Sequence, residues 1–248
     1  MADNKPDNRP WPQAGRTRMI MRSPVGNVGT DSYHDEHDLL AKLDDKHVFM
    51  MGDNPALPRM PEKPTLIDFI KCRFNEFTAH HLLGSAKRAM DDGHSDNVVM
   101  ACMLHDFANG CLVRCDHGYW GAQLIAPYVN EEVTWAVKYH QALRYYADPA
   151  VGYEYPESYK KFFGPDYVPP EYIRLDAEYA KNHKWYMTAR LVTMYDLYFF
   201  DDTAKLHNPD DFADIINRNF RQPPEGLGFD DSPSAHMWRT MIWPNNFL

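Results

Sequence analysis

The stretch Val98-Val99-Met100-Ala101-Cys102-Met103-Leu104-His105-Asp106 joins a run of apolar residues to an imidazole and a carboxylate. Such a run predicts a buried helix of the core. A carboxylate beside an imidazole at the end of a buried helix is costly unless a partner compensates its charge. Imidazole and carboxylate together suit iron, manganese or zinc. The stretch therefore predicts a metal site at one end of a core helix.

Two further His-Asp pairs, His34-Asp35 and His37-Asp38, lie in a polar segment without apolar neighbours. A short His/Asp tract is only a compositional hint of metal binding. We expect these side chains to be solvated ahead of a helix.

The composition limits the classes of function. The chain has 248 residues, of which 44% are hydrophobic and 14% aromatic, so a large core or a ring-rich pocket is expected. The net charge of -9 argues against a nucleic-acid groove or an anionic membrane surface. We expect a small-molecule substrate, no nucleic-acid partner and no membrane partner. The sequence does not set the oligomeric state.

Localisation is predicted from the same evidence. No apolar stretch approaches the roughly 18 residues of a membrane span, and the first residues lack the apolar core of a secretory signal. The four cysteines, Cys72, Cys102, Cys111 and Cys115, do not resemble a disulfide scaffold in a chain of this length. We expect a cytoplasmic protein. Cys111-x3-Cys115-x-His117 is an alternative half zinc site, but it lacks a second pair.

The periodicity predicts an all-α fold. Residues 1–64 form a Pro-rich N-terminal arm or cap with one short helix at 36–43, residues 65–220 a helical core, and residues 221–248 a tail that packs on it. Within the core we expect helical stretches at 66–77 and 80–90, either separate or continuous, and helices at 97–107, 116–128, 131–146, 171–205 and 210–219, with a loop at 147–170. Thr65, Ser95 and Asn130 are suited to begin helices, and Asn109-Gly110 to end one. Alternating strand patterns, glycine-rich phosphate loops and repeats are not found.

Six candidate ligands fall on five successive predicted helices, and they are His81, His105, Asp106, His117, His140 and Asp196. Helical bundles build metal sites from side chains of facing helices. Six ligands exceed the need of one tetrahedral ion, whereas two ions with one bridging carboxylate use them all. Asp196 lies in an apolar stretch where an unpaired carboxylate is unfavourable. Asp201 and Asp202 lie nearer a polar helix end, so we do not expect them to be metal ligands.

At these residues the chain resembles the HD-domain superfamily, and more narrowly its mixed-valent diiron oxygenases that cleave organophosphonates, relatives of myo-inositol oxygenase. The similar segments are His81-Leu-Leu-Gly-Ser-Ala86-Lys-Arg-Ala89, Leu104-His105-Asp106-Phe107, Asp116-His117-Gly-Tyr-Trp-Gly-Ala122 and His140-Gln-Ala-Leu-Arg-Tyr145, with Asp196 as the final aspartate. The resemblance covers about residues 65–205. His80 is an alternative to His81, but the alanines that follow favour His81.

The resemblance implies an HD-domain helical bundle holding two iron ions as an Fe(II)/Fe(III) pair. His81, His105 and Asp196 would hold one iron, His117 and His140 the other, and Asp106 would bridge them. The implied reaction uses O2 to cleave a carbon–phosphorus or carbon–carbon bond beside a hydroxyl-bearing carbon, with all electrons supplied by the substrate.

The resemblance also implies that Arg144, one turn after the fourth histidine, and Ser158 contact the phosphonate. The chain departs from the family at Thr193, where an arginine is expected, and at Gly84, where glutamine is typical. A larger or less charged substrate, such as a polyol, is therefore an alternative.

Two other functions stay open. Many HD-domain proteins are metal-dependent phosphohydrolases that activate water at a similar site. The histidines could also be incidental in a helical scaffold whose tail, with Trp238, Trp243 and Phe247, docks on a partner.

Overall fold

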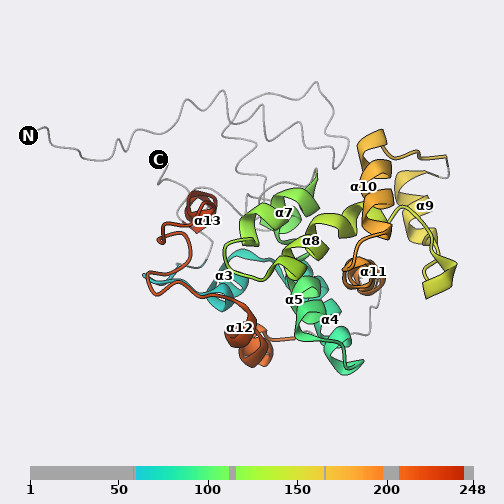
Figure 1. The fold of residues 1–248 in the computed structure, drawn as a ribbon. Helices are drawn as coiled ribbons and strands as arrows, with labels where there is room; N and C mark the ends of the chain where they lie inside the picture. Colours follow the sequence, from blue (N-terminus) through green and yellow to red (C-terminus); the bar gives the residue numbers. More distant parts are fainter. Residues whose placement is uncertain (1–57, 59, 112–115, 165, 198–206, 243–248) are drawn as a thin grey trace, which may run out of the picture. The chain divides into compact units, whose positions relative to one another are not determined.

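The computed structural model describes residues 58, 60–111, 116–164, 166–197 and 207–242, all within the unit Phe49–Leu248 (Figure 1). These residues form helices and contain no β-strand, only an isolated bridge between Asp148 and Tyr153. The all-α prediction is confirmed for them, whereas the HD-type bundle stays a prediction. Several predictions fall outside the described residues: the helix at 36–43, both polar His-Asp pairs, Asp201, Asp202, Trp243, Phe247 and the Cys111–Cys115 half-site.

The described helices follow one another along the chain in this order: α3 Leu66–Arg73, α4 Glu76–Asp91, α5 Asp96–Leu104, α6 Phe107–Cys111, α7 His117–Ile125, α8 Glu131–Leu143, η1 Pro149–Val151, α9 Glu157–Phe163, α10 Glu171–Lys181, α11 Tyr186–Tyr195, η3 Pro209–Phe212, α12 Ala213–Asn219 and α13 Ala235–Ile242. None of them is both long and apolar enough to cross a bilayer.

Capping side chains explain where several helices begin. Thr65 forms a reciprocal capping box with Asp68 at the start of α3. Asn130 accepts a hydrogen bond from the Val133 amide at the start of α8, as predicted. Asn75 accepts a hydrogen bond from the Thr78 amide at the start of α4, and this cap separates α3 from α4, which decides between the two alternatives that the sequence left open. Ser95 precedes α5 but makes no capping hydrogen bond with its side chain.

Other predicted boundaries were wrong. Asn109-Gly110 does not end a helix, because both residues lie inside α6. A Cβ on Gly110 would lie 2.8 Å from Thr78 Cγ2, so this glycine permits close packing instead. The predicted loop at 147–170 contains η1 and α9, and the long helix at 171–205 is divided into α10 and α11 around residues 182–185.

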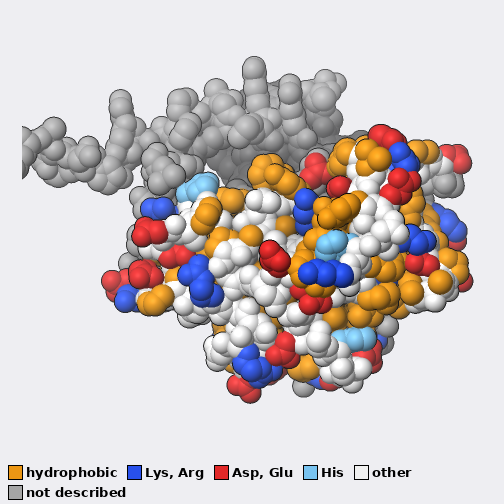
Figure 2. Space-filling view, viewed as in Figure 1, with side chains coloured by type: hydrophobic (Ala, Val, Ile, Leu, Met, Phe, Trp, Pro, Cys, Tyr) orange, Lys and Arg blue, Asp and Glu red, His pale blue; other side chains and the backbone are white. Residues whose placement is uncertain are grey.

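The core is built around α5, whose residues from Val98 to Leu104 are all buried. This helix packs against α4, α8 and α11, and it lies between them in Figure 1. Its apolar run therefore occupies the position that the sequence predicted. Figure 2 shows hydrophobic side chains at the surface on the α9–α11 side of the visible face.

The C-terminal helix α13 contributes to the same core. Trp238 is fully buried, with its ring 4.9 Å from that of Phe69, and its indole donates to the Leu124 carbonyl. Arg73 donates hydrogen bonds to the carbonyls of Met241 and Ile242. These bonds satisfy carbonyl groups at the end of α13 that a helix leaves without partners.

Candidate metal centre

The structure brings all six candidate ligands together from five helices and one turn. His81 lies in α4, His105 is the C-cap of α5, Asp106 follows it in the turn before α6, His117 opens α7, His140 lies in the last turn of α8, and Asp196 is the C-cap of α11. The five helices are not successive as predicted, because α6, α9 and α10 intervene. The four imidazoles are buried, and the Asp106 and Asp196 side chains are only 15% and 11% exposed.

One group consists of His81, His105 and Asp196. The two Nε2 atoms of the histidines lie 3.0 Å apart, and Asp196 Oδ1 lies 3.2 Å from His81 Nε2 and 3.5 Å from His105 Nε2. Two ligands bound at about 2.1 Å and at right angles are roughly 3.0 Å apart. These separations therefore fit neighbouring ligands of a single metal ion.

Asp106 connects this group to the other two histidines. Its Oδ1 lies 3.1 Å from His117 Nε2 and 3.7 Å from His140 Nε2. Its Oδ2 lies 3.8 Å from His81 Nε2 and accepts a hydrogen bond from Asn109. The two oxygens of one carboxylate thus face two sets of imidazoles, which is the arrangement of a bridging ligand.

The distances do not separate the six ligands into the two groups that the resemblance implies. The ligand atoms of His105, Asp106 and His140 all lie within 4.8 Å of one another, so His105 belongs geometrically to both groups. His117 is outside that set of three, but its contact to Asp106 Oδ1 is shorter than that of His140. We therefore keep His117 among the candidate ligands.

Backbone carbonyls orient two of the rings. His105 Nδ1 donates to the Cys102 carbonyl at 2.7 Å, and His140 Nδ1 donates to the Val137 carbonyl at 2.6 Å. Because a carbonyl only accepts, Nδ1 carries the hydrogen in both rings and Nε2 faces the centre. His140 Nε2 is buried and makes no hydrogen bond within the described part of the chain. A metal ion would satisfy this buried nitrogen, which is otherwise costly.

The charges of the site depend on one another. Burial alone would raise the pKa of Asp106 and Asp196, but the surrounding imidazoles hold both well below their usual value. Burial lowers the pKa of His105, yet Asp106 and Asp196 outweigh it and raise that pKa to about 9. Burial lowers the pKa of His140. Two ionised acids are therefore enclosed among imidazoles, and His105 holds a proton when no metal is bound.

Gly118 explains why α7 and α8 approach closely enough to bring His117 near His140. A Cβ on Gly118 would lie 2.8 Å from the Lys138 carbonyl oxygen, closer than real Cβ atoms come. The Gly118 amide also donates to Gln141 Oε1 at 3.0 Å. The first turn of α7 therefore packs directly on the backbone of α8, which places the rings of His117 and His140 5.2 Å apart.

Arg144 follows α8 and is enclosed by aromatic rings. Its guanidinium lies 5.0 Å from the Tyr145 ring, 5.7 Å from Tyr159 and 5.6 Å from Phe163. It donates to the Tyr145 hydroxyl, but it forms no salt bridge within the described residues, and its Nε is buried without a hydrogen bond there. Burial opposes the charge, while Tyr145, Tyr159 and Asp196 raise the pKa of Arg144.

The sequence did not identify Tyr159. Its hydroxyl donates to Asp196 Oδ2 at 2.8 Å, so it fixes the carboxylate whose other oxygen faces His81 and His105. Tyr159 lies in α9, which was predicted as loop; the Pro156-Glu157 pair that opens this helix was the available signal. Ser158 lies beside it, and no hydrogen bond joins Ser158 to the six ligands among the described residues.

Arg190 does not replace the arginine that is absent at Thr193. It is buried and donates to the carbonyls of Leu143 and Tyr146, so it stabilises the junction of α8 and α11. Thr193 is buried and donates to the Arg190 carbonyl. Among the described residues near the site, Arg144 is thus the better candidate for binding an anion.

No protein-family model matches the chain, and no curated protein is significantly similar to it. The described residues hold His/Asp groups that can bind a metal ion. Which ion binds and which reaction follows are therefore inferred from the resemblance to the HD-domain superfamily together with the geometry of the site.

Proposed function

We propose that this protein is an HD-type oxygenase that uses O2 to cleave a carbon–phosphorus or carbon–carbon bond next to a hydroxyl-bearing carbon. The observation that carries the proposal is the convergence of four buried imidazoles on two ionised carboxylates. A mononuclear site does not need so many ligands, whereas two ions with a bridging carboxylate use all of them.

The residues fit an assignment in which His81, His105 and Asp196 hold one iron. His117 and His140 would hold the second iron, and Asp106 would bridge the pair. The different partners of Asp106 Oδ1 and Oδ2 support this role. A mixed-valent Fe(II)/Fe(III) pair held there would supply oxygen activation and oxidation of the hydroxyl-bearing carbon.

The surrounding residues bind and orient the substrate. Arg144 offers a guanidinium that forms no salt bridge with a described carboxylate, which suits a phosphonate or another oxyanion. Tyr159 holds Asp196 in place through its hydroxyl. The rings of Tyr145 and Phe163, 5.4 Å apart, exclude water from Arg144 and so strengthen its attraction to an anion.

The test combines metal content, spectroscopy and oxygen uptake. We expect about two irons per chain, a mixed-valent paramagnetic resonance signal after partial reduction, and oxygen consumption with a small hydroxylated phosphonate or polyol. His81→Ala should remove the signal, and His80→Ala, at the neighbouring position, is the matched control that should retain it.

The phosphohydrolase alternative gives a different outcome in the same assays. Such an enzyme would release phosphate or nucleoside from a phosphoester without consuming oxygen and without the mixed-valent signal. A protein that binds no metal at all, with His80→Ala and His81→Ala indistinguishable, would exclude both reactions and favour a scaffold.

A further inference from the structure

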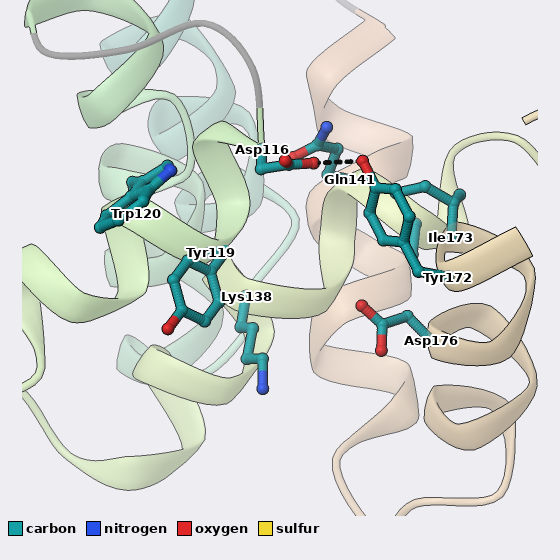
Figure 3. A pocket seen from close by; sticks show the side chains of 9 residues that line it. Asp116, Tyr119, Trp120, Lys138, Gln141, Tyr172, Ile173 and Asp176 are labelled. Carbon is teal, nitrogen blue, oxygen red and sulfur yellow. Dashed lines mark hydrogen bonds between the residues drawn. The ribbon is translucent and has the colours of Figure 1, made fainter. Parts of the chain in front are cut away.

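A cavity lies between α7, α8 and α10, and neither the six metal-site residues nor Arg144 or Tyr159 line it (Figure 3). Its volume is about 310 Å³. This is near the lower end of the roughly 300–1,000 Å³ of small-molecule sites. The polar and aromatic side chains that line it are Asp116, Tyr119, Trp120, Lys138, Gln141, Tyr172 and Asp176, and the Asp116 carboxylate accepts a hydrogen bond from the Tyr172 hydroxyl.

Lys138 and Asp176 bring opposite charges to this cavity, and neither forms a salt bridge within the described residues; burial raises the pKa of Asp176, and the Lys138 ammonium across the cavity lowers it. Asp176 makes no hydrogen bond or salt bridge there, and Figure 3 shows its carboxylate pointing from α10 into the cavity. Lys138 Nζ lies over the rings of Tyr139 at 4.9 Å and Tyr119 at 5.9 Å, but it too forms no salt bridge. A carboxylate and an ammonium left open in one small cavity can receive both charges of one ligand.

Gln141 adds a polar group of fixed orientation. Its Oε1 accepts the Gly118 amide, so its NH2 group is the part left to donate to a ligand. That NH2 group makes no hydrogen bond to any described residue. In Figure 3 the Gln141 amide and the Lys138 ammonium lie at opposite ends of the cavity, so Lys138 is the donor for a ligand carboxylate and Gln141 can donate to another polar group.

Aromatic rings form the walls. Tyr119, Trp120 and Tyr172 are 46%, 42% and 49% exposed, which is high for large apolar side chains. In Figure 3, Tyr119 stands on the α7 side of the cavity and Tyr172 on the α10 side. Rings on opposite sides of a narrow cavity suit a flat apolar group in offset or edge contact.

We propose that this cavity binds a zwitterionic amino acid with an aromatic side chain. The ligand ammonium pairs with Asp176, its carboxylate accepts from Lys138, and its ring lies between Tyr119 and Tyr172. This is a binding function separate from the proposed oxygenase reaction, because no metal-site residue takes part.

The test is calorimetric titration of the full chain with three related compounds. L-phenylalanine carries both charges, phenethylamine lacks the carboxylate, and 3-phenylpropionate lacks the ammonium. We expect L-phenylalanine to bind at least about tenfold more tightly than either singly charged compound. Binding is expected to be unchanged after chelator treatment, which separates this site from the metal centre.

Matched variants locate the site. Asp176→Asn and Lys138→Met should each weaken L-phenylalanine binding about tenfold. The controls Asp166→Asn and Lys184→Met change an exposed acid and an exposed lysine that lies over the Trp185 ring, and should have no effect. Melting temperatures of all four variants establish that they are folded.

Several outcomes would overturn the proposal. Equal binding of phenethylamine would indicate a site for cations alone, and equal binding of phenylpropionate a site for anions alone. Absence of heat with all three compounds up to about 10 mM would mean that the cavity has no such ligand. Loss of binding on chelation would place the amino acid on the metal.

Discussion

Replacing Gly118 with alanine should separate the two halves of the metal centre. The new Cβ would lie 2.8 Å from the Lys138 carbonyl oxygen, 3.0 Å from the Val137 carbonyl oxygen and 3.2 Å from Gln141 Cβ. Two of these atoms belong to the backbone of α8, which cannot move aside like a flexible side chain. The first turn of α7 must therefore shift away, and His117 moves with it.

The expected magnitude follows from overpacking, which costs about 1–3 kcal/mol. In a chain of this size that corresponds to a fall in melting temperature of roughly 2–12 °C. Because His81, His105 and Asp196 lie on α4, α5 and α11, their group should remain intact. The Gly118→Ala protein should thus retain about one metal ion where the parent binds about two.

Gly84→Ala is the matched control, since Gly84 also lies inside a helix but has no atom within 4 Å of a Cβ placed on it. Alanine should raise helix stability there by about 0.5–1 kcal/mol and leave metal content unchanged. Thermal unfolding and metal analysis of the two purified variants measure both effects. A Gly118→Ala protein with the melting temperature and full metal content of the parent would refute the close-contact reasoning.

Three other perturbations give separate outcomes. Arg73→Met leaves buried carbonyls of α13 without their donor, so the free energy of unfolding should fall by about 2–4 kcal/mol in a urea titration; a change below about 0.5 kcal/mol would contradict this. Tyr172→Phe removes the 2.6 Å hydrogen bond to Asp116, a residue held at a φ of 51° just before His117. Metal affinity should drop about tenfold, whereas Tyr179→Phe on the same helix should have no effect. The pKa of His105, raised from 6.5 to about 9 against the effect of burial, predicts that its contribution to the stability of the metal-free protein is fully present at pH 6.5 and is lost as the pH rises through 9. Because metal displaces the proton, the metal-loaded protein should not lose this stability; urea unfolding at about pH 6 and pH 9.5, with and without chelator, checks both.

The sequence was informative wherever the burial pattern was strong. The run from Val98 to Leu104 predicted the central helix because an uninterrupted apolar segment has few alternatives to the core. The ligands could be proposed because His105 and Asp106 stand at its end, where an uncompensated charge is unfavourable. That the six side chains converge depends on long-range packing, which no local pattern specifies.

The failures have physical reasons as well. The pattern predicts a helix stop at Gly110. Instead, the absence of a side chain at Gly110 makes room for Thr78, a residue of α4 that is distant in sequence. Tyr159 was not identified, because its hydrogen bond to Asp196 joins residues 37 positions apart and a tyrosine in an aromatic-rich segment carries no distinguishing signal. The cavity with Asp176 and Lys138 could not be predicted either, because the sequence pattern shows no break between α10 and α11.

The proposed ligands are spread along the chain from His81 in α4 to Asp196 at the end of α11. During synthesis the full set is therefore complete only after Asp196 has left the ribosome. An ion captured earlier would meet an incomplete set of donors and would exchange readily. Ions held by all six side chains in the proposed site would link α4 to the end of α11, two elements more than 100 residues apart in the sequence.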